Sequence, residues 1–192
     1  MERSFILRKI LLFSLLCFVL FLSACNKDTV ADFSFTTQDN ETLSLDDLKG
    51  KYWIADFIFT NCTTVCLPMT ANMKSLQDAI IEKDLDVHLV SFSVDPDYDT
   101  PEVLQQYAES YDADLTTWSF LTGYEFDTIK EFSIKSFSSM VHEPVEGDDQ
   151  VIHGTQFFLV NPEGKIIERY DGIQSSEIEN ILADLENFLQ SS

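Results

Sequence analysis

Short apolar runs alternate along this chain with segments of helical periodicity, and this alternation restricts the fold more than any other feature of the sequence. Residues 53–59 (WIADFIF) and 87–94 (VHLVSFSV) each have the length and composition of one buried strand. Between them, residues 68–81 carry apolar side chains such as Met73 and Ile80 at helical spacing. The pattern therefore predicts buried strands that are separated by covering helices.

The remaining elements continue the alternation. Thr100 and Pro101 have the residue types of a helix N-cap and a first helical position. The sequence then predicts, in order, a strand at 118–121, a short helix at 125–132, a polar stretch at 133–152, two strands at 156–160 and 165–170, and an amphipathic helix at 178–189. Asn161-Pro162-Glu163-Gly164 between the last two strands is typical of a β-hairpin turn.

This order of elements predicts an α/β protein with a thioredoxin-like fold. We expect a central, mostly parallel sheet flanked by helices, with the stretch 133–152 as an insertion before the C-terminal β-hairpin. Residues 33–192 are enough for one domain with a full core. In open α/β sheets, binding and catalytic groups gather beyond the carboxyl ends of the strands.

The N-terminus has the pattern of a secretory signal. Basic residues precede the apolar segment 10–22, which is short for a membrane span of about 20 residues. The following Leu22-Ser23-Ala24-Cys25 resembles a bacterial lipobox. We therefore expect a signal peptide at 1–24 and a lipidated tether at 25–32, with two or more acyl chains on Cys25. The alternative is an uncleaved transmembrane anchor, and both predict an extracytoplasmic, membrane-attached domain.

The formal net charge of −21 limits the partners of this chain. Such a surface repels phosphate backbones, which argues against nucleic-acid binding. It also repels anionic lipid headgroups, so lipid on Cys25 rather than a basic patch would hold the protein at the membrane.

Cys62 and Cys66 are the only two of the four cysteines that lie beyond the signal segment and the lipobox. They follow the strand 53–59 and enter the next helix, where the helix dipole stabilises a thiolate. The three-residue spacer separates them by about one helical turn, so the pair can attack a disulfide, bind a soft metal or close a disulfide. A purely stabilising disulfide is the weaker interpretation, because a five-residue loop gains only roughly 2 kcal/mol.

The three histidines differ in their suitability as a further metal ligand. Two thiolates suit Cu(I), and an added nitrogen ligand also suits Cu(II). His88 lies in an apolar strand and is typical of a hydrogen-bonded core histidine, whereas His142 lies in the polar stretch and is typical of a solvated loop. His153 directly precedes the hairpin, which in a thioredoxin-like sheet returns beside the cysteines. His153 is therefore the best candidate for a third ligand.

Four ordered segments resemble the Sco/SenC family: Leu48–Thr70, Ser91–Ala108, Trp118–Gly123 and His153–Ile166. The resemblance implies a thioredoxin-like domain that binds one copper ion, as Cu(I) or Cu(II), through Cys62, Cys66 and His153. It also implies a role in assembling the binuclear copper centre of cytochrome c oxidase subunit II, by copper delivery or by preparation of the acceptor's thiols. The implied partner is that subunit or a related copper-accepting protein.

Two departures qualify the resemblance, and one further acidic residue matches it. Leu67 stands where the family usually has proline, and Pro68 follows it. Gly154-Thr155 stand where thioredoxins have a cis-proline, which argues against a general reductase. Asp95 matches a family motif and could orient His153 or a backbone amide, although a turn-forming role in VDPDYDTP is an equal alternative.

Two function classes remain open for the cysteine pair. The first is a lipid-anchored copper-binding assembly protein. The second is a thiol-disulfide oxidoreductase, in which one thiolate attacks a partner's disulfide and the other resolves the mixed disulfide. A peroxidase is disfavoured, because no threonine or arginine motif around Cys62 is assignable to peroxide activation.

Overall fold

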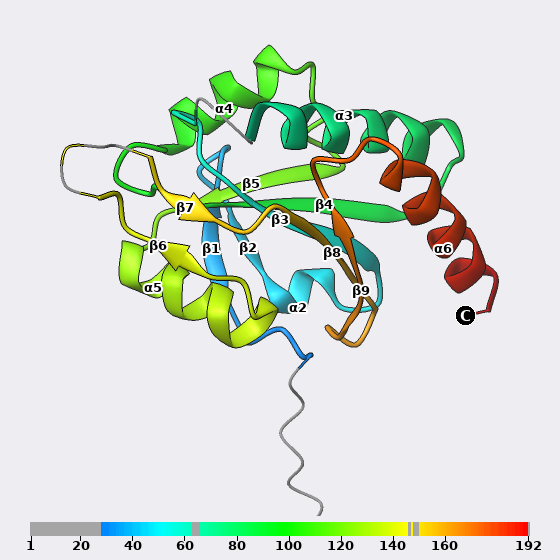
Figure 1. Ribbon diagram of the computed structural model, residues 1–192. Coiled ribbons are helices and arrows are strands. Elements are labelled where there is room, and N and C mark those ends of the chain that lie inside the picture. Colours follow the sequence, from blue (N-terminus) through cyan, green and yellow to red (C-terminus); the bar gives the residue numbers. More distant parts are fainter. Residues whose placement is uncertain (1–27, 63–65, 146, 148–149, 192) are drawn as a thin grey trace, which may run out of the picture.

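The computed structural model describes residues 28–62, 66–145, 147 and 150–191, which form a mixed β-sheet with helices on both faces (Figure 1). The expected signal peptide and Cys25 lie outside the described residues, as do the first three residues of the expected tether. Within the described ranges, no helix combines the length and the apolar character that crossing a membrane requires.

The elements follow the predicted alternation of strands and helices. In chain order they are β1 (Ser34–Thr37), β2 (Thr42–Ser44), α2 (Leu45–Leu48), β3 (Tyr52–Ile58), α3 (Cys66–Glu82), β4 (Val87–Ser93), α4 (Pro101–Ser110), β5 (Trp118–Thr122), α5 (Phe126–Phe132), the π-helical segment η1 (Ser133–Phe137), β6 (Val141–His142), β7 (Ile152–His153), β8 (Gln156–Val160), β9 (Ile166–Asp171) and α6 (Glu177–Ser191). Helix α4 begins as expected, with the Thr100 hydroxyl accepting the backbone N–H of Val103.

The main sheet has the strand order β2-β1-β5-β4-β3-β8-β9. Its central strands β3, β4 and β5 are parallel, as predicted. The other pairings among the described strands are antiparallel, so the expectation of a mostly parallel sheet holds only for the centre. The prediction failed at the edge because it missed the hairpin β1–β2, whose strands of four and three residues are mostly polar and show little apolar alternation.

Successive side chains of β3 enter two different cores, because neighbouring residues of a strand point to opposite faces. Trp53 and Phe57 pack in the core that α2, α5 and η1 cover. Ile54 and Ile58 pack in the core that α3, α4 and α6 cover. Figure 1 shows these two groups of helices on opposite sides of the sheet. The predicted flanking of the sheet by helices is therefore confirmed.

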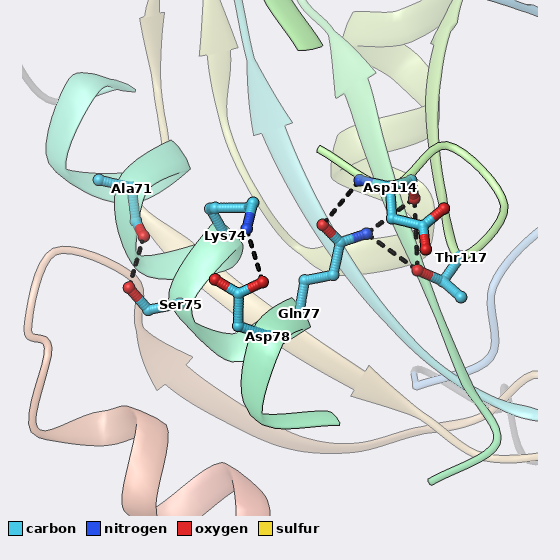
Figure 2. Close-up of polar contacts among 7 residues, drawn as sticks. All are labelled: Ala71, Lys74, Ser75, Gln77, Asp78, Asp114 and Thr117. Atoms are coloured by element: carbon cyan, nitrogen blue, oxygen red, sulfur yellow. Dashed lines mark hydrogen bonds and ion pairs between the residues drawn. The ribbon is translucent and has the colours of Figure 1, made fainter. Parts of the chain in front are cut away.

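Helix α3 is held to the rest of the domain by a buried amide as well as by its apolar face (Figure 2). The Gln77 side chain donates to the carbonyl of Asp114 (2.8 Å) and to the Thr117 hydroxyl (2.9 Å), and accepts the backbone N–H of Asp114 (3.0 Å). Lys74 and Asp78 form an exposed ion pair one turn apart. The amide fixes α3 against the connection that leads into β5.

The insertion before the C-terminal hairpin contains structure that the sequence did not predict. Segment η1 sends Phe137 into the core, where its ring lies 5.3 Å from that of Phe57. Strands β6 and β7 then form a separate two-stranded ribbon, in which Val141 pairs with His153. These elements are too short to give a periodic signal in a polar stretch.

The first described residues are packed against the C-terminal hairpin. Thr29 forms a bridge with Lys165, and the N–H of Val30 donates to the carbonyl of Gly164 (2.9 Å). Because Trp53 pairs with Val160, the hairpin turn lies at the end of the sheet where β3 begins. The chain therefore enters the domain at the end opposite the cysteine pair.

Candidate metal centre

The cysteine loop begins where β3 ends. Cys62 is buried, and its backbone N–H donates to the carbonyl of Phe59 at 3.4 Å. Cys66 is the first residue of α3, while its side chain lies outside the described part of the chain. The N-terminus of α3 carries no acidic residue in its first turn. Its backbone amides and dipole therefore favour an anion such as a thiolate close to this position.

His153, the last residue of β7, comes close to this loop although it lies about 90 residues further along the chain. Its ring lies 5.7 Å from the ring of Phe59, in an edge-to-face arrangement with an interplanar angle of 83°. Its Nδ1 is 2.9 Å from the carbonyl of Gly154. Since a carbonyl only accepts, Nδ1 is the donor in this contact, and in the neutral imidazole Nε2 is then the lone-pair nitrogen that a metal ligand requires.

A second contact joins the same two segments. The Gln150 side-chain amide donates to the carbonyl of Asn61 at 3.1 Å, immediately before Cys62. Together with the contact between Phe59 and His153, it brings residues 150–153 beside residues 59–62. The sequence predicted this return of the chain from topology but gave no signal for Gln150.

Asp99 anchors the start of the cysteine loop. Its buried carboxylate accepts the backbone N–H of Thr60 (3.2 Å to each oxygen) and the Thr60 hydroxyl (2.5 Å). It also accepts the Ser93 hydroxyl at 2.5 Å, and the Tyr124 hydroxyl donates to the carbonyl of Ser93. Burial raises the pKa of Asp99 to about 6, although these hydrogen bonds act to lower it. Asp99 thus ties the cysteine loop to the end of β4.

Asp95, the acidic residue that the sequence singled out, lies four residues before Asp99. Its backbone carbonyl accepts the N–H groups of Tyr98 (3.1 Å) and Asp99 (2.9 Å), and its own N–H donates to the Ser93 hydroxyl. Its side chain lines a cavity of about 400 Å³. The backbone contacts are those of a turn, and the orientation of His153 by Asp95 stays a prediction.

Asp56 is a second buried carboxyl that sequence reasoning missed. It lies in the middle of β3, where its Oδ1 accepts the Ser91 hydroxyl at 2.5 Å. Its Oδ2 has no hydrogen-bond partner among the described residues. Burial raises the pKa of Asp56 to about 7, against the Ser91 bond and the positive potential of His153, which both lower it. The single acidic residue within WIADFIF was the available signal.

The other two histidines have the environments that the sequence suggested. His88 is partly buried and its Nε2 lies 2.9 Å from the Ser119 hydroxyl, and burial lowers the pKa of His88 to about 4. His142 is exposed on β6. The part of the chain that the structure describes contains no group of three or more histidine, cysteine, aspartate or glutamate side chains arranged for a metal ion. Of the expected ligands, it includes the side chains of Cys62 and His153.

The fold and the position of the cysteine pair define a thioredoxin-like protein. The family model described as SCO1/SenC matches residues 23–190, which is most of the chain. The chain therefore belongs to the SCO1/SenC family, and the resemblance seen in the sequence is confirmed.

Solved structures of this family are similar over almost their full length. A SCO1/SenC family lipoprotein from Bacillus anthracis is 46% identical, with 84% of this chain and 95% of the other covered at a TM-score of 0.80. BsSco, described as a Sco family cytochrome c oxidase assembly protein with a disulfide switch, is 45% identical, with 83% and 92% covered at 0.76. ScoI of Bradyrhizobium japonicum, solved with copper bound, is 23% identical, with 83% and 98% covered at 0.70. The thioredoxin-like fold is thus confirmed.

Replacing Asp99 by alanine is expected to destabilise the protein. The change leaves the Thr60 N–H and two hydroxyl groups without their acceptor, so we expect the free energy of unfolding to fall by about 2 kcal/mol or more. Urea unfolding measures the change. Asp97→Ala is the matched control, because Asp97 is exposed in the same turn and should change stability by less than about 0.5 kcal/mol. Equal effects of the two substitutions would contradict the anchoring role of Asp99.

Asp56 is expected to make stability depend on pH. Because its pKa is raised from 3.8 to about 7, the folded state binds its proton more tightly than the unfolded state. The stabilising contribution of the protonated group is therefore complete below pH ~4 and is lost as the pH rises through about 7. Relative to Asp56→Asn, wild-type stability should fall by up to roughly 4 kcal/mol over this range. The free energy of unfolding is measured in urea for both proteins at each pH. An equal change with pH in the two proteins would refute this assignment.

Proposed function

We propose that this chain is a copper-binding protein that assists assembly of the binuclear copper centre of cytochrome c oxidase subunit II. It would deliver copper, reduce the thiols of the acceptor, or do both. The observation that carries the proposal is the approach of the His153 segment to the Cys62 loop in a member of the SCO1/SenC family. BsSco, a member of the Sco family of cytochrome c oxidase assembly proteins, and ScoI, solved with copper bound, support it by analogy.

The proposed ligands of one copper ion are Cys62, Cys66 and His153. Sulfur ligands select Cu(I), and imidazole also accommodates Cu(II). The burial of Cys62 and the tautomer of His153 fit this ligand set. Asp95 remains a proposed orienting group for His153. Copper is here the cargo of the protein, held by two thiolates that a partner's thiols can replace by ligand exchange.

The proposed location is the extracytoplasmic face of the membrane. Residues 1–24 would be removed as a signal peptide, and lipid on Cys25 would anchor the tether 25–32. Asp28 forms an ion pair with Arg169 (3.1 Å), and Val30 is buried, so the freely extended part of such a tether would be short. The anchored end of the domain would be opposite the copper site, which would face away from the membrane.

The proposed partner is cytochrome c oxidase subunit II or a related copper-accepting protein. The net charge of −21 supports this over nucleic-acid binding. A thiol-disulfide oxidoreductase acting on a partner's cysteine pair is the second candidate, because the same two cysteines serve both functions and BsSco is described with a disulfide switch. The described residues contain no cis peptide bond, and so lack the cis-proline that is typical of general reductases.

Copper titration of the reduced protein tests the copper site. We expect one tight equivalent, with sulfur-to-Cu(II) charge-transfer absorption. Affinity should fall at least 100-fold in Cys62→Ser, Cys66→Ser and His153→Ala, because each loses a ligand, and about 10- to 100-fold in Asp95→Asn if that group orients His153. His88→Gln is the matched control and should bind normally, since His88 bonds to Ser119 within the sheet. Oxidation of the pair without bound copper would instead favour the oxidoreductase.

Cell fractionation tests the anchor. Wild-type protein should be found with the membranes and should incorporate labelled fatty acid. Cys25→Ser should lose the label, because the acylated thiol is absent, while Cys17→Ser should keep it. Label-free wild-type protein that remains in the membrane fraction would indicate an uncleaved transmembrane anchor instead.

A further inference from the structure

Soft and borderline metal donors gather at a second place in the molecule, next to His153 but apart from the cysteine pair. A cavity of about 240 Å³ is lined by Met140, His142 and His153, together with Ile152 and small or polar residues of the same ribbon. The chain has only three histidines and four methionines. Two histidines and one methionine therefore border one small cavity.

The other described donors of these types are engaged elsewhere. Met69 and Met73 are fully buried in the core under α3. His88 is hydrogen-bonded to Ser119 within the sheet. In the part of the chain that the structure describes, Met140 is the one exposed methionine and His142 the one exposed histidine.

The β6–β7 ribbon directs Met140 and His142 to the same side. Met140 directly precedes β6 and His142 lies in it, and both are exposed and line this cavity, whereas Val141 between them is buried. Met140 is 64% exposed, and Ile152, which pairs with His142, is 57% exposed. The flexible methionine side chain can bring its sulfur to a metal ion held by the neighbouring imidazole.

We propose that the Met140 thioether and the His142 imidazole form an auxiliary Cu(I) site at the mouth of this cavity. Thioether sulfur is a soft donor that selects Cu(I), and imidazole also binds copper. The site uses neither cysteine, so it goes beyond the function proposed above and does not depend on it. His153 lines the same cavity and also contacts Phe59, which precedes the cysteine loop. Copper held here would lie near one of the ligands proposed for the cysteine site.

The test uses the full-length chain in detergent, with all four cysteines replaced by serine, so that binding at the cysteine pair cannot contribute. Ag(I) serves as a redox-inert probe for Cu(I), and ¹³C-methyl methionine NMR reports the contact. We expect the Met140 methyl signal to shift and saturate near one equivalent of Ag(I). The buried methyl groups of Met69 and Met73 are internal references and should not move.

Three variants in the same background identify the ligands. Met140→Leu and His142→Ala should each weaken Ag(I) binding at least tenfold. Ile152→Leu is the matched control, because it alters the same exposed face without removing a donor, and it should bind as the parent does. Because the substituted side chains are exposed, we expect each variant to fold with little change in stability. Urea unfolding checks this.

An unshifted Met140 methyl, or unchanged affinity in His142→Ala, would overturn the auxiliary site. Failure of the copper titration with the intact cysteines would overturn the function proposed above instead. The two results are independent, because one protein lacks all the cysteines and the other retains them.

Discussion

The antiparallel pairing of β8 with β3 is the constraint on which the rest of the site depends. Ala55 pairs with Phe158, so the chain that leads into β8 must pass beside the end of β3. This passage brings His153 to Phe59, just before the cysteine loop. The pairing is stabilised by burial of β8 on both faces, with Phe157 in one core and Phe158 in the other. The geometry of the candidate metal centre is therefore a consequence of packing in the centre of the sheet.

Two buried carboxyl groups lie close to this site, and their environments differ. Asp99 accepts hydrogen bonds from Thr60 and Ser93, which compensate much of the cost of burying its charge. Asp56 accepts one hydrogen bond, from Ser91, and its second oxygen has no partner among the described residues. Burial raises the pKa of both carboxyl groups, and the more numerous hydrogen bonds to Asp99 act against that rise. Asp99 holds the loop in place, whereas Asp56 reduces the stability of the sheet at neutral pH.

The insertion at residues 133–152 is held to the rest of the domain at both of its ends. Phe137 fixes the start of the insertion in the core, and Gln150 fixes its end beside Asn61. Between these two anchors, the β6–β7 ribbon is exposed on one face and carries Met140 and His142 there. The described N-terminus packs at the other end of the sheet. The ribbon and the cysteine loop thus lie at the same end of the sheet, away from the described N-terminus.

The α/β class, the thioredoxin-like order of elements and the position of Cys62 and Cys66 after a buried strand could be predicted from the sequence. These features depend on local periodicity and on residue types that are visible in short windows. The same windows could not reveal the hairpin β1–β2 or the ribbon β6–β7, because their strands are short and polar or exposed. They singled out Asp95 but gave no signal for Asp99, which binds the start of the cysteine loop. Asp99 meets Thr60 across 39 residues of chain. No short window reveals such a contact, because burial and long-range hydrogen bonds depend on how the strands pack.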